Sequence, residues 1–136
     1  IMFMISENIY VGDDSDCFER DGFVIIHACK TCYKKAEKNK NDLYLNMIDP
    51  LLPLFNLELF KDAICFIKKN IGTNKILIHC NKGKSRSASI AMLYCFGGLD
   101  YGEAQYNMSN IYPDYSPSLG IDTYMYENWD KLKQLL

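Results

Sequence analysis

Apolar residues fall in short runs along the first half of the chain, and these runs predict β-strands. Residues 9–12, 23–27 and 75–79 are each a mainly apolar block of four or five positions, which is typical of a buried strand. Residues 43–48 form a further strand-like run, and Pro50 marks a turn or loop after it. We therefore predict four strands.

A helical period of apolar residues appears in the segments between and after these strands. The predicted helices are residues 33–40, 56–71, 87–95, 100–112 and 118–136. Gly72 directly follows the second of these helices, and Gly97 and Gly98 end the third. Asp100 opens the fourth with capping-box spacing, and we expect Ser118 to cap the last.

Strands that alternate with helices predict an α/β fold with a mostly parallel central sheet flanked by helices. A chain of 136 residues is long enough for one core but not for two. We therefore expect a single domain that spans residues 1–136.

Composition removes several classes of function. The net charge of −2 gives no general signal for nucleic-acid binding, and no apolar run is long enough for a membrane helix. The six cysteines lie on predicted helices and strands, which favours a reducing compartment over a secreted disulfide framework. We expect a cytoplasmic monomer, with the nucleus as an alternative location.

The loop between the strand at 75–79 and the helix at 87–95 carries the candidate chemistry. It reads His79-Cys80-Asn81-Lys82-Gly83-Lys84-Ser85-Arg86-Ser87. A strand, a tight loop and a helix N-terminus together form an anion site, because unpaired backbone N–H groups and the positive end of the helix dipole converge there. The same surroundings favour the thiolate form of a cysteine. The motif therefore predicts a phosphate held against a nucleophilic sulfur.

Each key position of this loop has a chemical reason. Cys80 would attack phosphorus, Arg86 offers a planar fork that matches two phosphate oxygens, and Gly83 lets the backbone approach the ligand. Packing alone would explain a buried Cys80, but it does not call for an arginine six positions later. The nucleotide P-loop pattern fails, because it requires a glycine where Ile78 stands.

On these residues the segment resembles the signature loop of the cysteine-dependent protein tyrosine phosphatase superfamily. Among its branches it is most similar to the small, atypical dual-specificity phosphatases. The likeness runs from end to end: residues 9–12 are similar to the family's opening strand, and residues 117–121 are similar to its Pro-Asn-x-Gly-Phe segment, with Ser118 in place of the asparagine. The resemblance implies a protein tyrosine phosphatase-like fold and hydrolysis through a cysteinyl-phosphate, without a cofactor or a metal.

The resemblance also implies roles for individual residues. Cys80, Arg86 and Ser87 would be catalytic, with Ser87 easing the departure of the sulfur from the phosphoenzyme. His79 and Ser118 would support the loop, although the serine departs from the family pattern and puts this bracing in doubt. The residues expected to bind the phosphate are Asn81, Lys82, Gly83, Lys84, Ser85 and Arg86.

A general acid is expected on a separate loop, because phenolate and alkoxide groups leave better when protonated. Asp49 lies 80 − 49 = 31 residues before Cys80, close to the spacing of the family, and no other acid between Asp42 and Glu58 competes with it. The residues after it, 51–55, are unusually apolar. We expect them to cover the site or to contact an apolar part of the substrate.

The substrate class stays open between two alternatives. The chain has no room for the extra phosphotyrosine-recognition elements of the tyrosine-specific enzymes, which implies a shallow pocket for phosphotyrosine, phosphoserine and phosphothreonine in proteins. Lys82 and Lys84 instead resemble the branches that act on phosphoinositides, phospholipids or inositol phosphates. Two ammonium groups favour substrates with more than one phosphate.

Two further hypotheses belong to other classes of protein. One is a phosphate-binding module with no turnover, against which the set Cys80, Arg86 and Asp49 argues. The other is a thiol redox protein, from the C-x-x-C pair Cys29 and Cys32, but this would leave the signature loop unexplained. Some lipid-directed relatives form a disulfide between the nucleophile and a cysteine at the position of Cys29, so we also consider Cys29 as a redox partner of Cys80.

Overall fold

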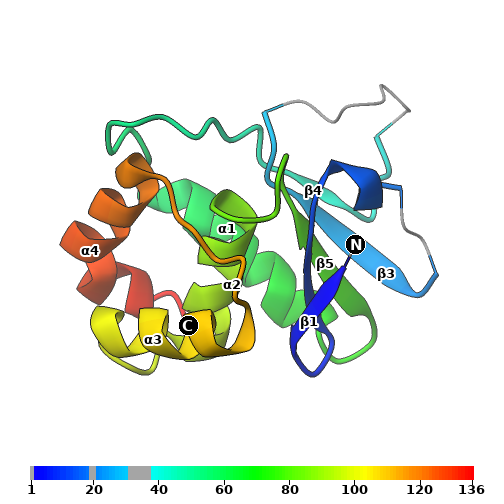
Figure 1. Ribbon diagram of the computed structural model, residues 1–136. Coiled ribbons are helices and arrows are strands. Elements are labelled where there is room, and N and C mark those ends of the chain that lie inside the picture. The colour runs from blue at the N-terminus through cyan, green and yellow to red at the C-terminus, as the bar shows by residue number, and fades with distance from the viewer. Residues whose placement is uncertain (1, 19–20, 31–37) are drawn as a thin grey trace.

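The core of the protein is a five-stranded sheet with the strand order β1-β2-β5-β3-β4 (Figure 1). The computed structural model describes residues 2–18, 21–30 and 38–136. The strands are β1 (Phe3–Ser6), β2 (Ile9–Gly12), β3 (Phe23–His27), β4 (Leu43–Tyr44) and β5 (Lys75–His79). Only β1 pairs antiparallel with its neighbour, so the sheet is mostly parallel, as the sequence predicts.

The middle strand β5 lies between β2 and β3, and the three strands end at the same level. His79 pairs with Gly12 on one side and with His27 on the other. The carboxyl ends of these parallel strands therefore form one edge, which is where ligands bind in open α/β sheets.

The apolar runs exist because the central strands are buried on both faces. Ile76 and Ile78 of β5 belong to the main hydrophobic core, whereas Leu77, between them, is fully buried on the opposite face. Val24 and Ile26 of β3 join the same core, with Ile25 between them buried on the other face. Successive side chains of a strand point to opposite faces, so a continuous apolar run is needed to fill both.

Four α-helices gather on one side of the sheet in Figure 1. They are α1 (Leu57–Asn70), α2 (Arg86–Phe96), α3 (Tyr101–Ile111) and α4 (Leu119–Lys133), and a short 3-10 helix η1 (Asp14–Asp16) follows β2. Helix α2 is the central one, because it contacts β1, β2 and β5 as well as the three other helices. This position explains why residues 87–93 are almost all apolar or small and all buried.

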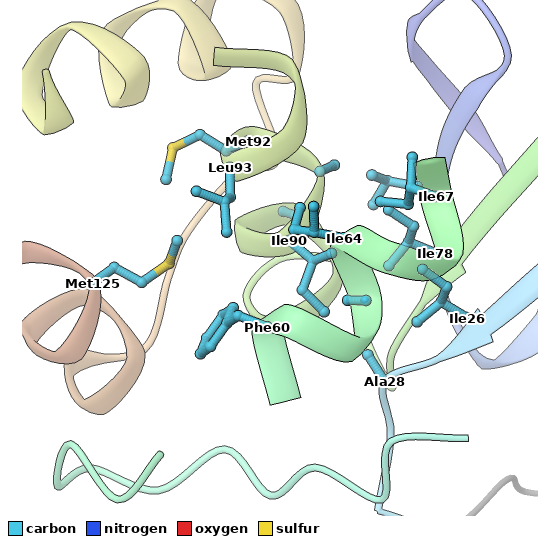
Figure 2. Packing of buried hydrophobic residues seen from close by; sticks show 14 of the residues in the cluster. Ile26, Ala28, Phe60, Ile64, Ile67, Ile78, Ile90, Met92, Leu93 and Met125 are labelled. Atoms are coloured by element: carbon cyan, nitrogen blue, oxygen red, sulfur yellow. The ribbon is translucent and has the colours of Figure 1, made fainter. Parts of the chain in front are cut away.

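Figure 2 shows the core between α1, α2 and the sheet. Phe60, Ile64 and Ile67 of α1 lie in one cluster with Ile78 of β5 and Ile90 of α2. These α1 residues are the apolar positions whose helical spacing predicts the helix. The core therefore fixes α2, and with it the loop that precedes α2, against the sheet.

The structure corrects several expectations about elements. The strand predicted at 43–48 pairs only over Leu43–Tyr44, and the chain then leaves the sheet through Asn46, which has a φ of 52°. The strand β1 is not predicted by the apolar pattern. The helix predicted at 33–40 lies largely outside the described residues, and residues 38–40 are not helical.

Capping side chains hold the starts of α1 and α3 but not those of α2 and α4. Asn56 accepts a hydrogen bond from the backbone of Leu59, and Asp100 accepts one from Glu103. Ser118 stands at the N-cap position of α4, but its side chain makes no capping bond. The prediction that the Ser118 side chain caps α4 is therefore wrong, because its hydroxyl donates to Asp49 instead.

Candidate active site

The loop between β5 and α2 lies against the turn that follows β2. The backbone N–H of Cys80 donates to the carbonyl of Gly12 at 3.3 Å, and Asp14 N–H donates to the carbonyl of Asn81 at 3.3 Å. Gly83 has a φ of +73°, and a Cβ there would lie 3.0 Å from the carbonyl oxygen of Gly12. Only glycine fits this conformation without strain.

The segment between α3 and α4 braces the other side of this loop. The Tyr112 hydroxyl donates to the carbonyl of Gly83 at 2.8 Å, and burial raises the pKa of Tyr112 to about 12, which keeps this donor protonated. Ser116 N–H donates to the carbonyl of Lys84 at 2.9 Å. The loop is therefore held from both sides before any ligand binds.

Cys80 is almost completely buried, with 2% of its surface exposed, yet it lines the pocket at this edge of the sheet. Its sulfur lies 3.1 Å from the hydroxyl of Ser87, which is within hydrogen-bond distance. Ser87 belongs to the first turn of α2, whose unpaired N–H groups and positive dipole end favour an anion.

Arg86 joins the loop to the segment after β4. Its Nη1 donates to the carbonyl of Met47 at 2.7 Å, and its Nη2 donates to the side chain of Asn81 at 3.1 Å. Its Nε is buried without a hydrogen-bond partner among the described residues. A buried guanidinium N–H without a partner is costly, and an anionic oxygen in the pocket would satisfy it.

Asp49 reaches the same pocket from the opposite wall. The Ser118 hydroxyl donates to Asp49 Oδ2 at 2.8 Å, and the Ser85 hydroxyl donates to Oδ1 at 3.3 Å. Arg86 Nε lies 4.0 Å from Oδ2. The carboxylate is therefore oriented by two hydroxyl donors beside the guanidinium.

Ser118 supports the loop in a way that the sequence does not predict. Its backbone N–H donates to the hydroxyl of Ser85 at 2.9 Å, whereas its side chain holds Asp49. One residue at the start of α4 therefore orients both Ser85 of the loop and the candidate acid Asp49.

The pocket has a volume of about 280 Å³ and contains most of the predicted site residues. Its lining consists of Asp49, Cys80, Asn81, Lys82, Lys84, Ser85, Arg86, Ser116 and Ser118. Gly83, Ser87 and His79 lie behind this surface. Ser116 lines the pocket although no sequence signal marks it, since its contribution is a backbone bond to Lys84.

A buried chain of polar side chains lies behind Cys80. Nδ1 of His27 lies 2.7 Å from Nε2 of His79, and Nε2 of His27 lies 2.9 Å from the carboxylate of Asp42. Burial is the main cause that lowers the pKa of His79 to about 4, and the charge of His27 adds to it. His79 is therefore neutral at pH 7. The sequence marks His79, but it gives no sign that His27 and Asp42 continue the chain.

Cys29, the suggested redox partner, is buried directly after β3. Its sulfur lies within 4.8 Å of a ring nitrogen of His79 and of a carboxylate oxygen of Asp14. These three are the group of candidate metal ligands found among the described residues. Burial, followed by the charge of Asp13, raises the pKa of Asp14. Cys32, the other half of the C-x-x-C pair, lies outside the described residues.

The fold is that of the dual-specificity phosphatases. No known family model matches the sequence, but solved structures match the fold over nearly the whole chain. The dual-specificity phosphatase DUSP15 has a TM-score of 0.76 and 22% sequence identity, covering 98% of this chain and 94% of that one. The sequence-based resemblance is therefore confirmed for the fold.

Two other solved structures are similar over comparable lengths. The human tyrosine phosphatase-like serine/threonine/tyrosine-interacting protein has a TM-score of 0.77 and 21% identity, covering 96% of each chain. PTPMT1 in complex with PI(5)P has a TM-score of 0.74 and 15% identity, covering 98% of this chain and 97% of that one. Among the described residues, no helix is both long and apolar enough to cross a membrane.

Proposed function

We propose that this protein is a cysteine-dependent phosphatase that hydrolyses phosphate monoesters through a cysteinyl-phosphate intermediate. The observation that carries the proposal is one pocket that holds the thiol of Cys80, the carboxylate of Asp49 and the buried Nε of Arg86, which makes no hydrogen bond among the described residues. A nucleophile, an anion-binding fork and a proton donor are the groups that this reaction requires. The fold shared with DUSP15 supports a phosphatase function.

In the first step, the Cys80 thiolate attacks phosphorus and the bond from phosphorus to the leaving oxygen breaks. Asp49 gives its proton to that oxygen, so the product leaves as a neutral alcohol or phenol. The N-terminus of α2 and the charge of Arg86 stabilise the thiolate and then the transferred phosphoryl oxygens. The backbone and side chains of the loop, Asn81, Lys82, Gly83, Lys84 and Ser85, bind the same oxygens.

In the second step, water attacks the phosphocysteine and gives a proton to the Asp49 carboxylate. The sulfur leaves as a thiolate, and the hydroxyl of Ser87, 3.1 Å away, stabilises it by hydrogen bonding. His79 and Ser118 act as supports rather than as proton carriers. No metal or cofactor takes part in these steps, so chelation with EDTA should leave turnover unchanged.

Phosphoproteins are the first candidate substrate class. The described residues that line the pocket are Asp49, residues of the loop after β5, Arg86 at the start of α2, and Ser116 and Ser118 before α4. Such a site favours phosphotyrosine together with phosphoserine and phosphothreonine, as in a dual-specificity enzyme.

Polyanionic phospholipid head groups or inositol phosphates are the second candidate. Lys82 and Lys84 both line the pocket and are both exposed, so they are placed to meet a second phosphate. The structure of PTPMT1 with PI(5)P provides a fold neighbour in complex with such a lipid.

One panel of substrates tests both proposals. Phosphate release would be measured with phosphotyrosyl and phosphothreonyl peptides, phosphoinositides and inositol polyphosphates, with Cys80→Ser as the control. We expect turnover by the wild-type protein alone, because serine is a much weaker nucleophile than a thiolate. Release by neither protein would leave a phosphate-binding module as the better description, and equal release by both would exclude Cys80 as the nucleophile.

We also propose that Cys29 protects Cys80 from irreversible oxidation. Peroxide converts the Cys80 thiolate to a sulfenic acid, and the Cys29 thiol then displaces water to form the disulfide. Mass spectrometry of peroxide-treated protein should find a cross-linked Cys29–Cys80 peptide, and Cys29→Ala should instead accumulate the sulfinic form. The absence of the cross-link contradicts this role.

The proposed thiolate chemistry fits a reducing compartment, so we propose that the protein acts in the cytoplasm, with the nucleus as the alternative. The described cysteines Cys17, Cys29, Cys65, Cys80 and Cys95 form no disulfides. We further propose that the protein acts as a monomer, which size-exclusion chromatography with light scattering would check.

A further inference from the structure

Four highly exposed leucines lie on the two segments that carry Asp49 and Ser118. Leu51, Leu52 and Leu54, on the segment between β4 and α1, expose 74%, 63% and 62% of their surface, and Leu119 on the first turn of α4 exposes 63%. Leu51 is two residues from Asp49, and Leu119 directly follows Ser118, and both of these neighbours line the pocket. We call these four residues the leucine rim.

The backbone beneath the leucine rim is firmly seated. A Cβ on Gly120 would lie 2.1 Å from the carbonyl oxygen of Pro50 and 2.3 Å from that of Leu52, so the segment packs directly on the start of α4. In Figure 1 it runs over the N-terminal end of that helix. Pro50 and Pro53 restrict the backbone further. The outward position of the leucines is therefore built in.

The pocket beside the rim is cationic. Lys82, Lys84 and Arg86 line it, and Asp49 is the sole acid among the described lining residues. An apolar rim next to a cationic pocket is complementary to a surface that offers anionic head groups above apolar chains.

We propose that the leucine rim docks the protein on an anionic lipid surface, with the pocket facing the phosphate of a lipid head group. This inference rests on the proposed phosphatase function and names the form in which the substrate is presented. The rim leucines would enter the boundary between head groups and acyl chains, while Lys82 and Lys84 remain at head-group level.

The structure favours a lipid surface over two other occupants. A bound peptide would need a recess for its apolar side chains, but none of the four leucines lines the pocket, and all expose well over half of their surface. A second copy of the chain would bring the lysines of two pocket mouths together, and such like-charge contacts oppose association.

Vesicle sedimentation with the Cys80→Ser protein tests the proposal without turnover. Vesicles of phosphatidylcholine alone are compared with vesicles that also contain phosphatidylserine or a phosphatidylinositol phosphate. We expect stronger binding to both anionic kinds. Adding Leu51→Ser and Leu52→Ser should weaken it roughly tenfold, because the burial of two large apolar side chains is lost. Tyr106→Ser is the matched control, since Tyr106 on α3 is 70% exposed and lies outside the rim.

A second readout does not depend on the double variant. Leu52→Trp places an indole in the rim, while the native Trp129 is buried, donates to the carbonyl of Leu99 and gives a constant background. Anionic vesicles should shift the new emission to the blue. An unchanged spectrum together with no sedimentation overturns the proposal.

Other outcomes are equally decisive. Binding that survives the double leucine variant assigns the contact to another surface and overturns the proposal. If the protein does not bind vesicles but forms concentration-dependent dimers that the double variant breaks, the proposal is overturned in favour of a second copy of the chain. If the protein does not bind vesicles but loses affinity for phosphopeptides in the double variant, the proposal is overturned in favour of a peptide. Turnover of a soluble aryl phosphate by the wild-type protein tests the phosphatase proposal separately. A protein that hydrolyses this compound but binds no vesicles refutes only the leucine rim.

Discussion

Two of the segments that line the pocket, the loop at 80–85 and the segment at 45–56, are built in opposite ways. The phosphate loop at 80–85 is pinned by Gly12, Asp14 and Tyr112, and Gly83 lies in contact with the backbone of its neighbour strand. The segment from residue 45 to residue 56, which carries Asp49, has few backbone hydrogen bonds and exposes three leucines.

The difference fits the role that we propose for each segment. Stabilising a phosphoryl group requires donors that are already in place, because reorganisation during the reaction would cost catalytic power. A proton donor requires only one oriented carboxylate, and Ser85 and Ser118 orient Asp49. We call residues 45–56 the acid segment. Apart from Asp49, this segment is not required to hold the reacting groups, so its side chains can form a separate apolar surface.

Among the tests that separate the two segments, replacing Arg86 by Lys should give the largest loss of phosphatase activity. An ammonium cannot make the paired bonds to Met47 and Asn81 and also bind a phosphate. We expect kcat/KM for an aryl phosphate to fall by about 10³-fold. Inhibition by free phosphate should weaken in parallel, and unaltered inhibition would exclude Arg86 as the anion ligand.

Asp49→Asn should affect only the chemistry of the acid segment. We expect kcat/KM, which reports the first step alone, to fall by about 10²-fold for alkyl phosphates, which need a protonated leaving group. The loss should be much smaller for nitrophenyl phosphate, whose leaving group is stable as an anion. A uniform loss for both compounds would show that Asp49 is not the acid.

The pH dependence of stability tests the support behind the phosphate loop. The pKa of His79 is about 4 in the fold, below its ordinary value of 6.5, so the unfolded chain takes up the proton first as the pH falls. Stability therefore falls from about pH 6.5 towards pH 4. Between pH 7 and 5 the loss is about 2 kcal/mol in the free energy of unfolding.

Urea unfolding of the wild-type protein and of His79→Asn checks this effect. The asparagine does not titrate, so the drop in stability between the two pH values should shrink in the variant. The pH slope, rather than the absolute stability, is the readout, since the substitution also changes the contact with His27. Equal slopes would contradict the assignment.

Gly120→Ala should give the smallest effect, confined to the acid segment. The new methyl group would collide with the carbonyls of Pro50 and Leu52 and displace Asp49. We expect roughly a tenfold loss for alkyl phosphates and little change for nitrophenyl phosphate. Gly98→Ala is the control, because a Cβ there meets nothing within 4 Å. In the Asp49→Asn background the Gly120→Ala change should add almost nothing.

Much of the fold is predicted by the sequence, because the apolar residues that define each predicted strand or helix are the ones that the folded protein buries. The central strands at 9–12, 23–27 and 75–79 have the predicted bounds, and β3 and β5 are buried on both faces. Helix α1 likewise begins and ends within one residue of its apolar stripe. The predicted strand at 43–48 ends early at an edge of the sheet, because its neighbour β3 ends at His27, opposite Tyr44, and Asn46 takes a positive φ.

The sequence predicts those residues of the candidate site whose chemistry only one residue type can supply. Cys80, Arg86 and Gly83 are marked by a motif, and the structure brings the first two into one pocket with Asp49. The contacts of His27, Asp42 and Ser118 were not predictable, because each depends on the packing of distant segments. A serine before a helix looks like a cap, and only the position of Asp49 redirects its hydroxyl.

The hydrogen bond from Ser118 to Asp49 joins positions 69 residues apart, and Ser118 also meets Ser85, 33 residues before it. Contacts of such sequence separation form only after the chain between them has been ordered. During synthesis, Cys80 and Arg86 leave the ribosome well before α4 does. We therefore expect the nascent chain to carry the Cys80 thiol without an oriented Asp49, so that the proposed activity begins only when α4 docks.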